Sequence, residues 1–356
     1  MDRFQGGTGE SSDSPERRFW WRWPRARFRV RALMTLILLL GGCLGWLANR
    51  ANVQRDATAA IRQSGGTVVY DWQLTPVNYV YGHGFQPRVA GKSIWPKWLI
   101  DRLGPDYFGS VKQASLGSQA TNATMSHVGR LSQLEELDAT GGSKLTNAGL
   151  VHLQSLTRLR MVDLSLLPGV TGKGLIHLAE LTSLERLNLS SPVADADLVN
   201  LSRLTNLRLL RLNGGGNGIT DEGLANLKGL TELRELILRN SQVTGTGLTA
   251  LQGMIAMADL KLINSHLETL EPLQRMTGLK SLWIHRSPLD DRGLKHVENL
   301  KSLQYLSLED TRITDDGLKS LLDLRGLREV DARGTGVTIM GSATFQQSNP
   351  KTSIFR

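Results

Sequence analysis

The feature that most constrains the fold of this chain is a pair of apolar residues, three positions apart, that recurs nine times. The first residues of the nine pairs are Leu131, Leu156, Leu181, Leu204, Leu230, Met254, Met276, Leu300 and Leu324. The intervals between them are 25, 25, 23, 26, 24, 22, 24 and 24 residues. One unit of this length cannot bury its apolar side chains alone, whereas a stack of similar units can. The sequence therefore predicts a solenoid.

Each repeat contains two kinds of apolar spacing. In the clearest copy, Leu303-Gln-Tyr-Leu-Ser-Leu308 is followed by a turn at Thr311 and then by Ile313-Thr-Asp-Asp-Gly-Leu318. The alternating leucines predict a short strand, and the three-residue spacing that follows predicts a helix. We interpret acidic pairs such as Asp290-Asp291 and Asp315-Asp316 as helix starts, where carboxylates face the positive end of the helix dipole. Stacked units of this kind give an α/β solenoid with a parallel sheet on its concave side and helices on its convex side.

The Leu-x-x-Leu-x-Leu and Thr-Asp-x-Gly-Leu motifs resemble those of the leucine-rich repeat family, particularly its cysteine-containing subtype. The resemblance covers residues 111–337, including a degenerate first copy that begins at Val111. After the strand, where many members carry Asn or Cys, this chain mostly has hydroxyl residues, which we expect to bond the backbone of the turns. These residues are Ser241, Ser265, Ser287, Thr311 and Thr335. The resemblance implies a leucine-rich repeat fold and says little about activity, because one fold carries many functions.

An uncharged apolar run at residues 32–48 predicts a transmembrane helix. Crossing a bilayer core takes about 20 residues, and about 17 is near the lower limit. Seven arginines lie between positions 17 and 31, whereas only Arg50, Arg55 and Arg62 follow closely. The positive-inside rule then predicts a single-pass protein of the cell (inner) membrane, with residues 1–31 as an arginine-rich cytoplasmic arm and the repeats on the other side. With this anchor, the chain also resembles bacterial membrane-anchored leucine-rich repeat proteins.

Two other interpretations of the apolar run stay open. The run could be a cleaved signal peptide, or Leu40-Gly-Gly-Cys43 could be a lipidation site that makes Cys43 an acylated N-terminus. An uncleaved helix fits better because apolar residues continue to Leu47. Gly41 and Gly45 form a small-xxx-small pair, which indicates weak self-association through the membrane helix.

The segments around the repeats complete the predicted organisation. Residues 49–110 contain a charged juxtamembrane helix and an aromatic-rich stretch, which we interpret as the N-terminal cap that a solenoid needs. Residues 338–356 have no leucine and are predicted to be a loose C-terminal tail. The sixth repeat departs from the pattern at residues 265–273 and is two residues short, so we expect a local change of curvature there.

Composition and motifs argue against several functions. Residues 1–55 hold ten arginines against four acidic residues, so six of the nine net positive charges lie there. The repeats therefore lack the charge of a nucleic-acid-binding surface. Cys43 is the single cysteine, which excludes an intramolecular disulfide and a thiolate zinc site. We find no catalytic motif, and predict neither a cofactor, a metal nor enzymatic activity.

The outward face of the predicted sheet is the remaining candidate site. Residues between and beside the strand leucines point away from the core. Tryptophan, tyrosine and arginine together are typical of interaction hot spots, although an ordinary solvated face explains the same residues. The predicted ligand-binding residues are Arg186, Arg211, Arg239, Lys261, Trp283, His285, Tyr305 and Glu309. Our leading hypothesis is recognition of a protein or peptide in the cell envelope, and the alternative is a glycan- or cell-wall-binding module.

Overall fold

The computed structural model describes residues 30–74, 91–215 and 218–356, and the chain divides into two compact units, residues 1–47 and 48–356. The predicted cytoplasmic arm lies almost entirely outside the described residues. Helix α1 (Val30–Gln63) is continuous, so the predicted anchor and juxtamembrane helix belong to one element. Its part from Leu33 on is long and apolar enough to cross a membrane, and its most apolar stretch is not buried in the protein, although a signal sequence has the same properties. The helix is therefore a candidate membrane span.

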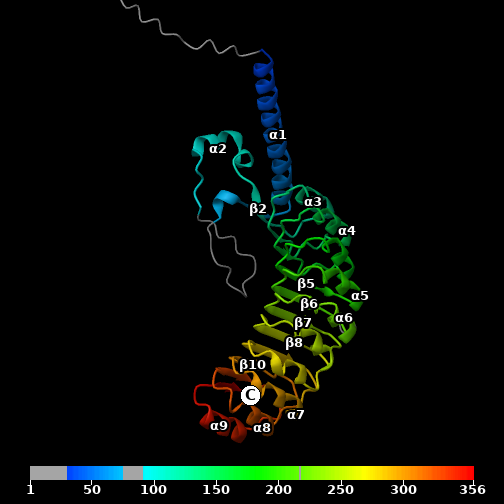
Figure 1. The fold of residues 1–356 in the computed structure, drawn as a ribbon, viewed down its shortest axis with the longest axis vertical. Helices are drawn as coiled ribbons and strands as arrows, with labels where there is room; N and C mark the ends of the chain where they lie inside the picture. The colour runs from blue at the N-terminus through cyan, green and yellow to red at the C-terminus, as the bar shows by residue number, and fades with distance from the viewer. Residues whose placement is uncertain (1–29, 75–90, 216–217) are drawn as a thin grey trace, which may run out of the picture. The chain divides into compact units, whose positions relative to one another are not determined.

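The described part of residues 48–356 is built on one twelve-stranded sheet whose strands follow chain order (Figure 1). Strand β1 is antiparallel to β2, and every later neighbour is parallel. The strands are β1 (Thr67–Tyr70), β2 (Val111–Ser115), β3 (Glu136–Asp138), β4 (Met161–Asp163), β5 (Arg186–Pro192), β6 (Leu209–Asn213), β7 (Glu235–Arg239), β8 (Asp259–Ile263), β9 (Ser281–His285), β10 (Tyr305–Ser307), β11 (Glu329–Asp331) and β12 (Ser353–Phe355). This order confirms the predicted parallel solenoid.

The other side of each repeat carries one or two helical turns (Figure 1). The helix that the sequence predicts in each repeat is short, because a repeat of about 24 residues must also hold a strand and two connections. Tight packing between repeats adds to this limit, since a Cβ at Gly223 would lie 1.8 Å from Asp195 Oδ1 of the preceding repeat. The helical segments are α3 (Asn122–Val128), α4 (Asn147–Leu150), η3 (Val151–Leu153), η4 (Gly172–His177), α5 (Asp195–Leu198), η5 (Val199–Leu201), α6 (Asp221–Ala225), η6 (Gly247–Leu251), η7 (Glu271–Arg275), α7 (Asp291–Leu294), η8 (Lys295–Asn299), α8 (Asp315–Leu318) and η9 (Lys319–Leu321), where η denotes a 3-10 helix.

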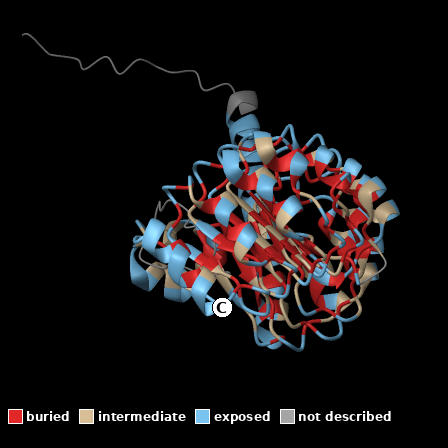
Figure 2. Cartoon of the chain, turned by 90° about the horizontal axis from the view of Figure 1, so that it is seen from below, coloured by how far each residue is buried: buried red, intermediate tan, exposed pale blue. Residues whose placement is uncertain are grey.

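The core runs through the stack between the strands and the helical segments, as the buried residues in Figure 2 show. Leu187 and Leu189 of β5, and Leu210 and Leu212 of β6, are all at most 2% exposed. Their neighbours on the strands point to the other side, which confirms the predicted period of two. Burying each leucine contributes about 1.5–3 kcal/mol, so the repeated leucines supply most of the stability of the solenoid.

The expected column of hydroxyl residues is only partly bonded to the turns. Ser287 Oγ donates to Leu267 O at 2.9 Å, and Thr311 Oγ1 donates to Leu308 O at 2.6 Å. The buried hydroxyls of Ser241 and Ser265 have no hydrogen-bond partner among the residues that the structure describes. These two serines belong to the repeats at and next to the shortened unit, so the turn bonding is weakest there.

Acidic and amide side chains at the helix starts connect many of the neighbouring repeats, a role that our helix-dipole interpretation missed. Asp291 accepts bonds from the backbone N–H and hydroxyl of Thr314 at 2.8 and 2.6 Å. Asp290 instead caps its own helix through the backbone N–H groups of Arg292 and Gly293. The same two bonds join Asp195 to Thr220, Asp221 to Thr244 and Asp315 to Thr338. Asn122 and Asn147 also accept from the backbone N–H of Thr146 and Thr171, but their side-chain amides donate to the threonine hydroxyls. We call this series the Asp–Thr ladder.

The ladder is interrupted where the repeat pattern changes. Gly245 stands one repeat after Asp221, at the position that would carry the next acceptor, and Thr269 stands one repeat later. Their correspondence is fixed by packing, because a Cβ at Gly245 would lie 2.3 Å from Thr269 Cγ2. The ladder resumes at Asp291. The change of curvature near residues 265–273 stays a prediction. The missing Asp–Thr bonds at Gly245 and Thr269 are a physical cause for it.

The first strands are covered by the end of α1 together with β1. Ala57 and Ile61 of α1 are fully buried. The side chain of Gln54 accepts a bond from Val111 N at 3.1 Å and donates to Gly109 O at 3.0 Å. Residues 91–110 add helix α2 (Lys97–Leu103) and the 3-10 turn η2 (Pro105–Tyr107), and η1 (Asp71–Gln73) follows β1. The described part of residues 49–110 packs beside the first strands, and its assignment as a cap stays a prediction; residues 75–90 lie outside the described residues.

The expectation of a loose C-terminal tail was wrong. Helix α9 (Ile339–Ser348) packs Phe345 into the core at 2% exposure, and β12 pairs with β11. Thr352 Oγ1 also donates to Leu327 O at 2.9 Å. The segment therefore pairs with the edge of β11 and covers the core beside it, as a capping element does.

Candidate functional site

The outward face of the strands, which we call the strand face, carries the predicted site residues in columns that run from strand to strand. The middle column contains Asn188, Arg211, Ile237, Lys261, Trp283 and Ser307. The distal column, nearer the strand ends, contains Asn213, Arg239, Ile263 and His285. The proximal column contains Arg186 and Tyr305. Parallel pairing in register thus aligns residues that are 22 to 26 positions apart in the chain.

Lys261, Trp283 and His285 form a contact cluster on β8 and β9. Lys261 Nζ lies 4.3 Å from the centre of the Trp283 ring, a distance suited to a cation–π interaction of about 0.5–1 kcal/mol. The Trp283 and His285 rings stack at 5.4 Å with an angle of 27°. Trp283 Nε1 donates to Ser281 Oγ at 3.0 Å. The indole is therefore held in one orientation and remains half-buried at the surface.

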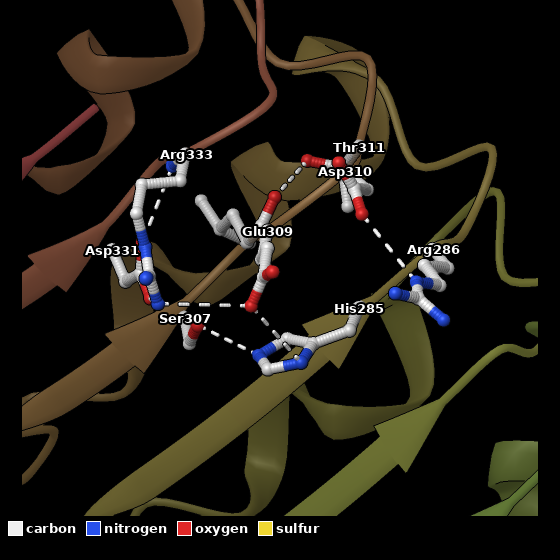
Figure 3. A network of polar contacts seen from close by, with 9 residues as sticks. His285, Arg286, Ser307, Glu309, Asp310, Thr311, Asp331 and Arg333 are labelled. Atoms are coloured by element: carbon white, nitrogen blue, oxygen red, sulfur yellow. Dashed lines mark hydrogen bonds and ion pairs between the residues drawn. The ribbon is translucent and has the colours of Figure 1, made fainter.

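A polar network continues from His285 toward the C-terminal repeats (Figure 3). His285 Nε2 is 2.7 Å from Ser307 Oγ, and His285 Nδ1 is 3.7 Å from Glu309 Oε2. The same Glu309 oxygen lies 3.7 Å from Arg333, whose guanidinium donates two bonds to Asp331 at 2.6 and 2.8 Å. Three neighbouring strands, β9, β10 and β11, thus contribute to one network through their last residues and the residues that follow them.

Burial and bonding set the charges of this network. Burial lowers the pKa of His285 and outweighs the carboxylates of Glu309 and Asp331, which act to raise it. The hydrogen bond from Arg333 lowers the pKa of Asp331, and the same bond raises that of Arg333. At neutral pH the network therefore combines a neutral imidazole at His285 with an ionised Asp331 and a charged Arg333.

Arg211 and Arg239 lie beside a pocket of about 290 Å3 on β5–β7. Arg211 donates to Glu235 Oε1 at 2.8 and 3.3 Å, and Glu235 is almost fully buried, so this arginine has a structural partner. Arg239 is exposed. The pocket is lined by Asn188, Leu189, Ser190, Arg211, Leu212, Asn213, Ile237 and Arg239. Its lining offers amide, hydroxyl and guanidinium groups, which suit carboxylates and peptide groups.

Asparagine side chains extend this polar surface along the strand ends. Asn240 Nδ2 donates to Asn213 Oδ1, and Asn264 Nδ2 donates to Asn240 Oδ1, both at 2.9 Å. Asn240 and Asn264 have φ values of 51° and 57°, in the left-handed region that asparagine tolerates better than most residues. The row therefore fixes both the backbone turns and the orientation of the amides.

The structure brings together most, but not all, of the predicted site residues. Lys261, Trp283, His285 and Glu309 share one network, and Arg211 and Arg239 share one pocket. Arg186 and Tyr305 lie in the proximal column, with Met161 and Leu209 beside Arg186 and with Ser281 and Glu329 beside Tyr305. The predicted list omitted Glu235, Ser307, Asp331 and Arg333, which position its members. Their register with the predicted residues was the available signal.

No metal centre is found in the part of the chain that the structure describes, since no group of three or more His, Cys, Asp or Glu side chains there could hold an ion.

No family model and no curated protein matches the chain. Among solved structures, an internalin (inlF) of Listeria monocytogenes is similar at 21% identity and a TM-score of 0.54, over 65% of this chain and 63% of the internalin. An internalin C2 of the same species is 19% identical with a TM-score of 0.37, over 62% of this chain and 84% of that one. The leucine-rich repeat ectodomain of the Arabidopsis thaliana receptor kinase GASSHO1/SCHENGEN3, solved with CASPARIAN STRIP INTEGRITY FACTOR 2, is 22% identical with a TM-score of 0.47, over 64% and 28%. This chain therefore spans less than two thirds of the first internalin.

Proposed function

Because the chain has a leucine-rich repeat fold, as its parallel stack and its similarity to the internalin show, we propose that it is a non-enzymatic binding module anchored in a membrane. In this proposal residues 32–48 span the inner membrane, the N-terminus is cytoplasmic, and the repeats lie in the cell envelope. The strand face, which we expect to be concave, binds a protein or peptide there.

The observation that carries the proposal is the organised side-chain network at Lys261, Trp283 and His285. A binding surface that is already ordered loses less side-chain entropy when its partner arrives. Here each ring or charge has a partner within the protein, yet Trp283 and Arg333 still reach the surface. A tryptophan surrounded by charged groups is also typical of residues that dominate the binding energy of protein interfaces.

The pocket beside Arg239 supports a peptide-like ligand. It lies next to the Asn213–Asn240–Asn264 row, so amide donors and acceptors follow it along the strand ends. The exposed guanidinium of Arg239 can bind a carboxylate of the ligand, whereas that of Arg211 is hydrogen-bonded to Glu235. A protein segment with an acidic side chain and exposed backbone amides matches these groups.

A glycan is favoured less than a protein by the geometry of Trp283. Sugar rings stack on a free aromatic face, but Lys261 approaches this ring to 4.3 Å and His285 stacks on it. Glycan binding is therefore kept as an alternative outcome of the experiment below.

The proposal is tested by affinity capture from solubilised cell envelope with residues 48–356 as bait. The bait begins at residue 48 because Ala57 and Ile61, at the end of α1, are buried in the core and must be kept. The test variant combines Trp283→Ala with Arg239→Ala. The matched control combines Ile255→Ala with Arg325→Ala, which removes a large apolar residue and an arginine from exposed positions away from the strand face.

We expect the unmodified bait and the control to capture the same protein. The test variant should capture at least about tenfold less of it, since removing a hot-spot residue costs about 2 kcal/mol or more of binding free energy. Equal capture by both variants would show that the strand face does not bind the captured protein. Retention of the unmodified bait by envelope polysaccharide alone would establish the glycan alternative.

A further inference from the structure

An exposed apolar patch lies on residues 94–107 and has no role in the proposed recognition of a partner. Ile94 is 90% exposed and Trp98 is 66% exposed, and Trp95, Leu103 and Tyr107 are also exposed. Apolar side chains gathered in this way on a soluble surface usually mark an interaction site. We call these five residues the α2 patch, because helix α2 (Lys97–Leu103) is at its centre.

The α2 patch is a fixed part of the cap. The rings of Trp95 and Phe108 pack at 5.3 Å. Arg55 of α1 donates to Leu103 O at 3.2 Å and lies over the Tyr107 ring at 5.6 Å. The patch is therefore presented to its surroundings in a defined orientation, attached to the α1 residues of the cap.

The composition of the patch matches the interfacial region of a bilayer. Tryptophan and tyrosine concentrate where hydrocarbon meets headgroups, because their rings are apolar and carry one polar atom. The exposed charged residues among them are Lys92, Lys97 and Arg102 against Asp101. Lysine and arginine can lay their apolar stems on the membrane while their charges contact anionic headgroups.

The short chain segment between the apolar run and the α2 patch favours a membrane as the surface that the patch contacts. Arg55, which bonds the patch, follows the last residue of the apolar run by only seven positions. A membrane that holds residues 32–48 therefore comes within reach of the patch by covalent linkage alone.

We propose that the α2 patch inserts into the headgroup region of a bilayer containing anionic lipid, and so forms a second membrane contact of this protein. The inference rests on the proposed anchoring of residues 32–48 in that bilayer. Two contacts hold a domain on a membrane more firmly than one, since the second binding step is intramolecular.

The test uses the full chain with Cys43→Ser, reconstituted in nanodiscs of phosphatidylethanolamine and phosphatidylglycerol. Single cysteines at Ile94→Cys, Ile255→Cys or Leu38→Cys carry an environment-sensitive fluorophore. Ile255 is the matched control, because it is 87% exposed but lies on a repeat. Leu38 reports on the anchor. Quenching is measured with a nitroxide attached to lipid headgroups and with iodide in the water.

At position 94 we expect strong quenching by the headgroup nitroxide and protection from iodide, and at position 255 the reverse. Adding Trp98→Ser should shift position 94 toward the behaviour of position 255. If position 94 is quenched by iodide as strongly as position 255, the second contact does not exist. Protection of position 94 from both quenchers would show that protein covers the patch, which also overturns the proposal.

The label at Leu38 separates two failures. If it is protected from iodide while position 94 is not, the anchor stands and only the second contact fails. If iodide reaches it freely, the proposed anchoring is wrong and the inference falls with it.

Discussion

His285 shows how position within the stack changes the chemistry of one residue. Its imidazole faces Glu309, which taken alone would favour protonation, but burial has the larger effect and lowers the pKa. The neutral ring can then exchange a hydrogen bond with Ser307 and stack on Trp283. The residue is best understood as a support for the tryptophan.

The lowered pKa gives a pH dependence with a defined sign. Above about pH 6.5, the ordinary value for histidine, His285 is neutral in both the folded and unfolded chains. As the pH falls below this value, the unfolded chain takes up a proton that the folded chain resists, so the free energy of unfolding decreases until the pH passes the folded pKa. Urea denaturation between pH 7.5 and 5 measures this change.

His285→Gln should have a smaller loss of stability over the same pH range, because glutamine does not titrate. Groups remote from position 285 contribute equally to both proteins, so the difference between their curves reports on the histidine and its immediate neighbours. Parallel curves would contradict the assigned effect of burial on His285.

At the scale of the elements, the Asp–Thr ladder joins repeats that the leucine core alone would only stack. Burial raises the pKa of Asp221, but the bonds from Thr244 and Thr246 outweigh this effect, and the net result is a lowered pKa. The pKa of Asp315 is lowered by its bonds from the backbone and side chain of Thr338. The rungs of Asp221 and Asp315 are therefore strongest with an ionised carboxylate, and weaken as the pH falls through the folded pKa of that carboxyl group.

Asp221→Ala should lower the free energy of unfolding by about 1–2 kcal/mol, because it removes the acceptor of a backbone N–H and of two hydroxyls. The chain itself supplies the control, since Asn147 makes the equivalent bonds to Thr171. Asp221→Asn should therefore retain most of the stability that alanine loses. Thermal unfolding of the three proteins measures both effects, and equal losses in the two variants would show that charge rather than bonding matters.

The C-terminal segment behaves as a structural element of the solenoid. Phe345→Ala should cost about 3–5 kcal/mol, the usual range for truncating a buried phenylalanine. Ile339→Ala, in the same helix at an exposed position, should change the free energy of unfolding by less than about 0.5 kcal/mol. Chemical denaturation measures the free energy of unfolding of both variants. A small effect of Phe345→Ala would show that the C-terminal segment does not stabilise the solenoid.

For the whole molecule, the repeat spacing was enough to predict the parallel stack and its buried face. Trp283 follows Lys261 by 22 positions, about one repeat, and the two residues pair in the same column. Their contact could therefore be predicted from the register of the strands. The pairing of Arg211 with Glu235 could not, because Arg211 stands opposite Ile237 and reaches diagonally. Side-chain rotation decides such contacts, and the repeat pattern carries no information about it.

Two further features escaped prediction for physical reasons. Asp291 has a sufficient local explanation as a helix-start residue, whereas its actual partner, Thr314, is 23 residues away. The closing segment was missed because Phe345 fills the last core position once, without a periodic pattern to reveal it. Periodicity places the ladder residues but does not reveal which side chain each of them bonds, and it gives no signal for a residue such as Phe345 that occurs once.

The central claim is that the strand face binds a protein partner, and photocrosslinking in living cells tests it most directly. A benzophenone amino acid replaces Ile263, which lies between Arg239 and His285 in the distal column, or Ile255, an exposed apolar residue outside the strands. We predict a discrete covalent adduct from position 263 that disappears with Trp283→Ala, and none from position 255. Absence of an adduct at position 263, or the same adducts at both positions, would contradict recognition through this face.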